Sequence, residues 1–153
     1  MQTATSDCPI KSRDTAPEMS QENVEQVKRG AEASNGRDIE ALLDTLDPEV
    51  QWSPAFPVLL GGEAKVYVGH DGVREMFRAF YDALDEIHAE YSEIRDRGDR
   101  VVAIGRIRTR GKASGAATES PFASISDFKD GKAIRVRTYL DPQEALEAAG
   151  LRE

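Results

Sequence analysis

Acid–base chemistry in this chain would start most simply at His70, one of its two histidines. His70 directly precedes Asp71, and a histidine beside a carboxylate is suited to proton transfer because the ordinary histidine pKa is about 6.5. Asp71 is equally well placed to cap a helix, and adjacent residues direct their side chains differently. His70 is therefore a catalytic candidate beside the alternative, and favoured, interpretation of a loop residue.

Ion binding is the second chemistry that the residue spacing allows. Arg106, Arg108 and Arg110 alternate along a predicted strand, so their side chains share one face. In one interpretation this face is outward, as a solvated basic stripe or a dimer contact. In the other, Arg106 reaches a pocket and pairs with Glu119 of the neighbouring strand, where the pair could hold an anionic or carbonyl group. The outward interpretation is favoured, and Arg106 and Glu119 stay catalytic candidates.

Aromatic side chains are the candidates for contacts with a ligand. Trp52 offers a large flat surface and one N–H donor, or else it is a core residue that closes the mouth of a pocket. Tyr67, Tyr81 and Tyr139 are candidate hydroxyl donors at the cavity or its rim, with ordinary amphipathic packing as the alternative. The residues expected to line a pocket are Trp52, Tyr67, Phe77, Tyr81, Ala123, Val136 and Tyr139.

Composition excludes several other classes of function. The net charge of −8 and the pI near 4.9 disfavour nucleic acid as a partner. Two histidines and the single Cys8 form no recognised metal-ligand cluster, and glycine-rich phosphate loops are missing, so no metal and no cofactor are expected. One cysteine allows no intrachain disulfide, which favours the cytoplasm, and no apolar run approaches the ~20 residues of a membrane span.

The elements that must position these residues begin after a polar segment. Residues 1–18 are predicted to be a disordered lead-in to one domain over 19–153, and either Met1 or Met19 could be the natural start. The patterns then predict helices over 20–35 and 39–46, a strand over 49–53, a loop of about fifteen residues, and a third helix capped by Asp71. Strands over 88–96, 100–110, 117–129 and 132–140 and a final helix from Pro142 follow.

The predicted fold class is α+β. A strongly bent antiparallel sheet would wrap around the N-terminal helices and the third helix as a cone that encloses an apolar pocket. Asp130-Gly131 predicts a tight type I′ turn in the last hairpin. The stripe of Val73, Met76, Phe77, Phe80 and Leu84 on the third helix would lie against the sheet.

Four stretches resemble the nuclear transport factor 2-like superfamily, and within it the SnoaL-like polyketide cyclases and relatives of ketosteroid isomerase. They are SNGRDIEALLDTLDPEVQW, GHDGVREMFRAFYDAL, SPFASISDFKDGKAIRVRTYLD and EALEAAGL. The resemblance covers about residues 20–151 and implies a conical pocket, a small apolar or aromatic ligand and a homodimer. The fold carries many chemistries, so it does not by itself imply an activity.

The resemblance also implies where isomerase chemistry would lie. Trp52 stands at the place of the general-base aspartate, and residues 28–30 match the region of the helix-1 tyrosine without a tyrosine. Ala123 or Ser124 stands at the place of the second acid. The Asp-Arg-Asp set of limonene epoxide hydrolase relatives has no match either. The chain is therefore not expected to be a steroid isomerase.

Two functions remain open from the sequence. The first is a SnoaL-like domain that binds an apolar or aromatic small molecule, with or without isomerase, cyclase or hydrolase activity. The second is a non-catalytic dimeric protein that binds a ligand or a partner.

Overall fold

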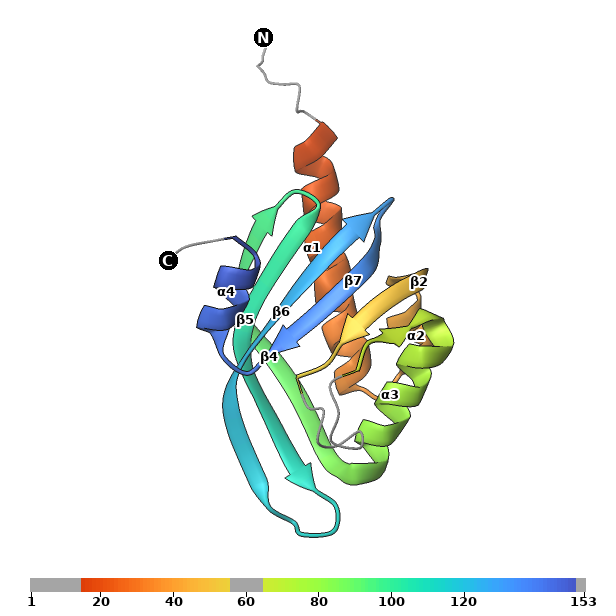
Figure 1. Cartoon of the computed structure of the whole chain (residues 1–153), viewed down its shortest axis with the longest axis vertical. Coiled ribbons are helices and arrows are strands. Elements are labelled where there is room, and N and C mark those ends of the chain that lie inside the picture. Colours follow the sequence, from red (N-terminus) through yellow and green to blue (C-terminus); the bar gives the residue numbers. More distant parts are fainter. Residues whose placement is uncertain (1–14, 56–64, 151–153) are drawn as a thin grey trace.

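The computed structural model describes residues 15–55 and 65–150 of the chain (Figure 1). Three helices lie in the first half, and long strands dominate the second. In chain order the elements are α1 (Thr15–Asn35), α2 (Ile39–Leu43), β2 (Leu46–Ser53), β3 (Tyr67–Val68), α3 (Gly69–Ala83), β4 (Leu84–Arg97), β5 (Arg100–Gly111), β6 (Ala117–Lys129), β7 (Lys132–Tyr139) and α4 (Pro142–Ala148).

The strands form one strongly curved, unclosed sheet in the order β3-β2-β7-β6-β5-β4 (Figure 1). β4 to β7 make the continuous antiparallel meander that was predicted. β2 runs parallel to β7, with Trp52 beside Val136, so the sheet is mixed and the prediction of a purely antiparallel sheet is wrong for this pair. A parallel pair needs a long crossover, and α3 with the four strands β3, β4, β5 and β6 supplies it here.

The two faces of the sheet carry separate apolar clusters. Val101 and Phe128 belong to the cluster of the inner face, which α1, α2 and α3 cover. Val102 and Ile125 belong to the cluster of the outer face, which α4 covers in part. Consecutive residues fall into different clusters because side chains alternate along a strand. Four members of the predicted α3 stripe are buried on this helix: Val73, Met76, Phe77 and Phe80. Leu84 is also buried, but it begins β4 instead of ending the helix.

Local signals explain several of the element boundaries. Asp130 and Gly131 have φ of 53° and 79°, as the predicted type I′ turn requires. Asp141 accepts a hydrogen bond from the backbone N–H of Gln143 at 2.9 Å and caps α4.

Other boundaries differ from the sequence prediction. α1 begins at Thr15 rather than near Ser20, so residues 15–18 are helical backbone, while the rest of the predicted lead-in, residues 1–14, lies outside the described residues. α3 begins at Gly69, and Asp71 lies inside its first turn, where it accepts from Arg74 at 2.9 Å instead of capping the helix.

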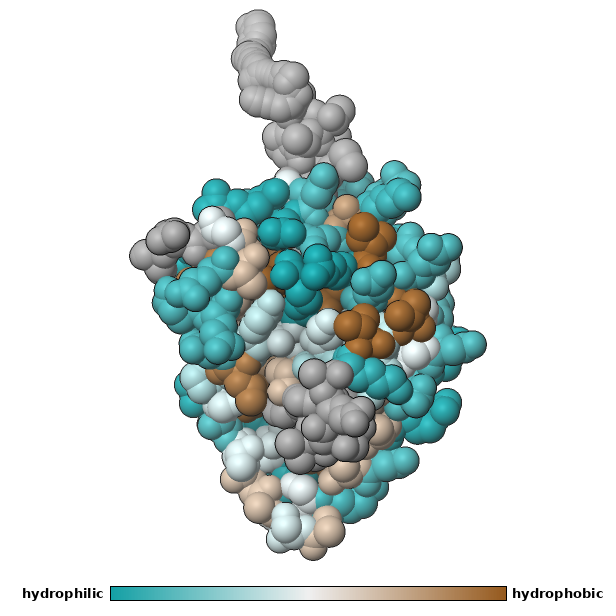
Figure 2. All heavy atoms as spheres, viewed as in Figure 1, coloured by the Kyte–Doolittle hydropathy of each residue, from teal (hydrophilic) through white to brown (hydrophobic). Residues whose placement is uncertain are grey.

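The surface is mostly hydrophilic on the face that Figure 2 shows, with small separate groups of hydrophobic residues. Among the described residues the exposed large hydrophobic side chains are Val66, Val68 and Leu140. No helix in the described part of the chain is both long enough and apolar enough to cross a membrane.

Candidate functional site

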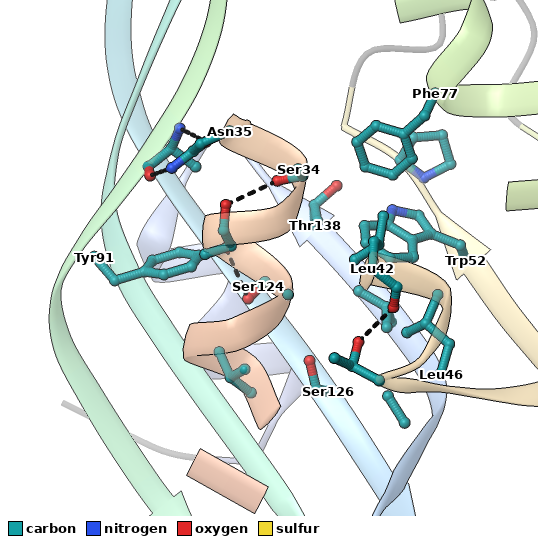
Figure 3. Close-up of a pocket in the computed structure, with 18 of the residues that line it drawn as sticks. Ser34, Asn35, Leu42, Leu46, Trp52, Phe77, Tyr91, Ser124, Ser126 and Thr138 are labelled. Carbon is teal, nitrogen blue, oxygen red and sulfur yellow. Dashed lines mark hydrogen bonds between the residues drawn. The ribbon is translucent and has the colours of Figure 1, made fainter. Parts of the chain in front are cut away.

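A cavity lies between the inner face of the sheet and the three helices that cover it (Figure 3). Its interior volume is about 100 Å³, and about 880 Å³ when the solvent at its open mouth is counted. Pockets for drug-sized ligands usually measure roughly 300–1,000 Å³. The interior volume lies below this range, so the interior alone has room only for a small ring system. A larger molecule would extend outward through the open mouth.

One wall of the cavity is apolar and aromatic (Figure 3). Leu42 and Leu46 come from the α2–β2 segment, and Phe77 comes from the buried stripe of α3. The Trp52 ring meets the Phe77 ring edge to face, with 5.5 Å between centroids and 89° between planes. Aromatic edges and faces of this kind form a flat, rigid surface against which another ring can pack.

The opposite wall carries hydroxyl groups on three strands (Figure 3). The Tyr91 hydroxyl on β4 donates to Ser124 Oγ on β6 at 3.2 Å. Thr138 on β7 donates to the backbone oxygen of Ser53 at 3.4 Å. Burial raises the pKa of Tyr91 and the hydrogen bond with Ser124 opposes that rise, so the phenol stays protonated near neutral pH.

Tyr91 reaches the cavity because β4 is irregular at this point. The register with β5 shifts between Tyr91 and Glu93, and Gly105 is the residue of β5 opposite Tyr91. A Cβ at position 105 would overlap the backbone oxygen of Glu90 and lie 2.7 Å from the Cα of Tyr91. Glycine thus permits the close approach of the two strands, and the bulge aims the tyrosine inward.

Asn35, the last residue of α1, fastens this helix to the edge of the sheet. Its Nδ2 donates to the backbone oxygen of Ala89 at 2.8 Å, and the Ala89 N–H donates to its Oδ1 at 2.9 Å. The side-chain amide thus pairs with β4 as another strand would, which leaves neither polar group unsatisfied beside the cavity.

The cavity is uncharged along its described lining. No aspartate, glutamate, lysine, arginine or histidine contributes to it, and Tyr91 is its one ionisable residue among those described. In residues 15–55 and 65–150 no cluster of histidine, cysteine and carboxylate side chains could hold a metal ion. The described lining can therefore bind apolar surface and form neutral hydrogen bonds, and it offers no side chain that is ordinarily a general base.

Three of the residues expected to line a pocket do so. Trp52, Phe77 and Val136 contact the cavity.

The other four are placed elsewhere. Tyr81 packs against Phe77 and donates its hydroxyl to the backbone oxygen of Ser34 at 2.9 Å. Tyr67 is buried beneath Lys65, and Ala123 and Tyr139 belong to the outer cluster.

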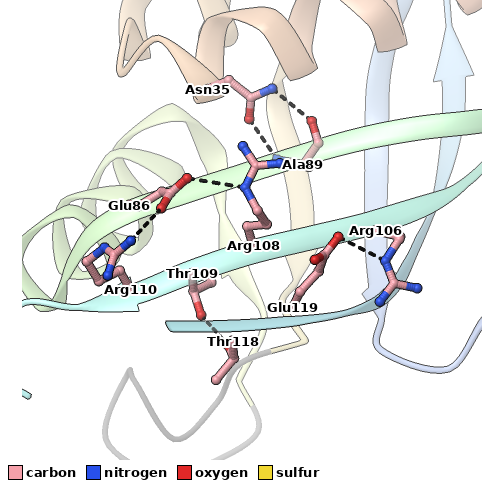
Figure 4. A network of polar contacts seen from close by, with 9 residues as sticks. All are labelled: Asn35, Glu86, Ala89, Arg106, Arg108, Thr109, Arg110, Thr118 and Glu119. Carbon is pink, nitrogen blue, oxygen red and sulfur yellow. Dashed lines mark hydrogen bonds and ion pairs between the residues drawn. The ribbon is translucent and has the colours of Figure 1, made fainter. Parts of the chain in front are cut away.

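The catalytic candidates are not brought together at the cavity. His70 makes a 3.0 Å hydrogen bond with the backbone oxygen of Leu46 at the start of β2. Arg106 and Glu119 do pair, with 3.0 Å between Nε and Oε2, but on the outer face, where their side chains are 57% and 49% exposed (Figure 4). The outward interpretation of the arginine stripe matches this placement.

The sequence reasoning missed most of the polar residues of the cavity: Gln26, Ser34, Asn35, Thr45, Tyr91, Ser126 and Thr138. For Ser126 a signal was available in the alternation along β6, whose inner face carries Phe122, Ser124, Ser126 and Phe128. The prediction that Ala123 lines the pocket was wrong by one position, because Ala123 lies on the outer face and the adjacent Ser124 lies on the inner face.

The places implied for isomerase chemistry all contact the cavity. Trp52, Gly30 from the helix-1 region, and Ser124 line it together. The scaffold therefore presents these three positions to one space, with an indole, a glycine and a hydroxyl in place of the acids and the tyrosine.

Comparisons with known proteins agree with this architecture. A family model of the SnoaL-like domain matches residues 27–136. An NTF2-like protein of unknown function from Burkholderia pseudomallei K96243 is 25% identical, with a TM-score of 0.72 over 82% of this chain and 95% of its own. TerC, crystallised with polyporic acid, is also 25% identical, with a TM-score of 0.71 over 82% of this chain and 96% of its own.

More distant structures share the fold. A protein with a ketosteroid isomerase-like fold from Catenulispora acidiphila is 15% identical, with a TM-score of 0.67 over 84% of this chain and 94% of its own. No curated protein sequence matches the chain.

Proposed function

This chain belongs to the SnoaL-like domain family, and on that premise we propose that its cavity binds a small, largely apolar molecule that contains an aromatic ring. The observation that carries the proposal is the edge-to-face pair of Trp52 and Phe77 in an uncharged cavity with an open mouth. A flat apolar ligand would pack on this pair and be removed from water, which is the main favourable contribution to such binding.

The similarity to TerC is in line with an aromatic ligand. That protein was crystallised with polyporic acid, and it matches this chain over most of both lengths. Because the described lining of this cavity has no charged side chain, an uncharged aromatic compound such as 2-naphthol is the rational first probe.

Binding, rather than proton transfer, is the role that the described lining favours. Catalysis by proton abstraction next to a carbonyl needs a positioned base and a donor to the developing oxyanion. Tyr91 and Ser124 can donate hydrogen bonds, but the described lining has no carboxylate or imidazole. An isomerase, cyclase or hydrolase activity would thus need a base from the ligand or from water.

Thermal unfolding of the purified protein with increasing 2-naphthol tests the proposal. A ligand that binds only the folded state raises its stability by about 2.7 kcal/mol at a hundredfold excess over the dissociation constant. We expect a saturable rise for the natural chain that Trp52→Ala abolishes while the variant stays folded. Tyr139→Ala is the matched control, because this aromatic residue packs on the outer cluster.

Two results would count against the proposal. One is the absence of a shift with 2-naphthol and with other small uncharged aromatic compounds. The other is equal loss of the shift in Trp52→Ala and Tyr139→Ala, which would place the bound molecule outside the cavity.

A homodimer is a second proposal, which the resemblance implied. The outer face supports it, because α4 leaves the half that carries Arg106, Arg108 and Arg110 uncovered and exposed. Sedimentation equilibrium of the natural chain would give the mass of a dimer. A single species at the 16.8 kDa of one chain would contradict it.

A further inference from the structure

Ser126 carries a hydroxyl group in the cavity without a hydrogen-bond partner among the described residues. The residue is 6% exposed, and it faces the cavity from β6 (Figure 3). Its strand neighbours on the same face are Val101 of β5 and Val136 of β7, neither of which has a polar side chain. In the described part of the chain, the buried side-chain polar atom that has neither a partner nor contact with solvent is Arg137 Nε, so the Ser126 hydroxyl remains open to the cavity. Water, or an oxygen or nitrogen atom of a ligand, can therefore form its missing hydrogen bond.

Other hydroxyl groups of the lining are already committed to the backbone. Ser34 Oγ donates to a carbonyl of α1 at 3.2 Å, and Thr45 Oγ1 donates to a carbonyl of α2 at 2.7 Å. Thr138 donates to a carbonyl of β2 at 3.4 Å. Each has used its one proton, so none of them can donate to a ligand without losing its present bond.

Ser124 reinforces the position of Ser126. The two residues are consecutive on the inner face of β6, and Ser124 accepts from Tyr91 at 3.2 Å. A serine hydroxyl that accepts still has its own proton to donate. The result is a pair of adjacent donors on one strand, and Val136 separates Ser126 from Trp52 across the inner face of the sheet.

Charge selects the kind of oxygen that this pair can receive. The described lining has no cation to neutralise a carboxylate or phosphate, and burying an ion without a partner is strongly unfavourable. A neutral hydroxyl or carbonyl oxygen has no such penalty and can form the missing hydrogen bond.

Taking the ligand-binding role proposed above as given, we infer that the cavity selects uncharged aromatic molecules, whose single hydroxyl or carbonyl oxygen bonds to Ser126. The ring of such a molecule lies against Trp52 and Phe77, and its oxygen points at β6. Ser126 is a specificity-determining residue in this arrangement, and Ser124 is the neighbouring donor.

Three probes of one shape separate the contributions: naphthalene, 2-naphthol and 2-naphthoate. At pH 7 the first has no oxygen, the second is a neutral phenol and the third is an anion, because phenols ionise near pH 10 and carboxylic acids near pH 4. Dissociation constants come from equilibrium dialysis against the full chain. We expect 2-naphthol to bind about fivefold to tenfold more tightly than naphthalene, the usual gain from one neutral hydrogen bond. The anion should bind more weakly than both.

The variants assign the oxygen to its residue. Ser126→Ala should bring 2-naphthol to the affinity of naphthalene and leave naphthalene unchanged. Ser34→Ala makes the same chemical change at a lining hydroxyl that is already bonded to α1, so it should preserve the preference.

The outcomes distinguish this inference from the proposed function. Binding of none of the three probes would defeat the proposed function. Tight binding of 2-naphthoate, or a preference for 2-naphthol that persists in Ser126→Ala, would overturn the inference while ligand binding itself stands.

Discussion

The two faces of β4, β5 and β6 differ in chemistry although the same strands form them. Toward the cavity these strands present Tyr91, Ile107 and Ser124, which are uncharged near neutral pH. Toward the outside they present Arg106 and Glu119 as part of a ladder of exposed ion pairs (Figure 4). Residues one position apart thus belong to different environments.

In this protein the charged side chains of Arg106 and Glu119 lie on the outer face of the strands, so they do not mark the position of the cavity. An exposed ion pair is solvated, screened by salt and worth at most about 1 kcal/mol. A hydroxyl in the cavity has few alternative partners, so each one present or missing changes what can bind. We therefore expect changes on the inner face to have the larger effects.

Gly105→Ala should lower the stability most, because its new side chain would clash with the backbone of the neighbouring strand β4. The new Cβ would overlap the oxygen of Glu90, forcing β4 away and displacing Tyr91. We expect a loss of about 3 kcal/mol in the free energy of unfolding, measured by urea denaturation. Gly30→Ala in α1 is the control, since its Cβ would meet side-chain atoms only at 3.4 Å. Equal stability of the two variants would show that the bulge is not tight.

The stability of the protein at alkaline pH should depend on Tyr81, which lies on α3. Burial raises the pKa of Tyr81 from 10.0 to about 12, against an opposing effect of Arg37. Between these pH values the unfolded chain loses the Tyr81 proton while the folded chain keeps it. The contribution of Tyr81 to the free energy of unfolding is therefore fully present below pH 10 and falls as the pH rises toward 12. Tyr81→Phe should lessen this fall. Parallel curves for both proteins would contradict the assignment.

Tyr91→Phe should cost less, because it deletes a single hydrogen bond. The donor to Ser124 disappears, and we expect about 1 kcal/mol of lost stability in urea denaturation. Tyr139→Phe makes the same deletion toward the outer cluster, where no side-chain hydrogen bond of Tyr139 occurs in the described structure, and should change little. A larger loss at Tyr139 would reverse the contrast between the faces.

Arg106 and Glu119 should give the smallest effect. A double-mutant cycle to alanine should return a coupling below about 1 kcal/mol, diminishing further in 1 M salt. The cycle for Arg100 and Asp127 provides the comparison, because that pair is closer, at 2.6 Å, and its side chains are only 35% and 19% exposed. Its coupling should be larger. A larger coupling free energy for Arg106 and Glu119 than for Arg100 and Asp127 would show that exposure does not determine the strength of these ion pairs.

Much of the fold could be predicted from local patterns. The α3 stripe, the Asp130-Gly131 turn and the Asp141 cap depend on residues a few positions apart, and the structure confirms all three. The resemblance supplied the rest of the architecture, which the match over residues 27–136 supports.

The candidate site was predictable only in part. Trp52 and Phe77 were found because large aromatic residues on an inward stripe form cavity walls in most folds of this kind. Ser126 was not, because the period-two pattern of its strand fits either face of the sheet.

By itself, the sequence determined most of the helices and strands and the order in which they follow one another, although β3 was not predicted. Only the tertiary structure decided that Ser126 faces the cavity, that the pair of Arg106 and Glu119 faces outward and that β2 lies beside β7. The reason is physical: helix stripes, caps and tight turns arise from neighbours along the chain. Strand register and facing are set by pairing between segments far apart in sequence, and a shift of one residue exchanges the two faces.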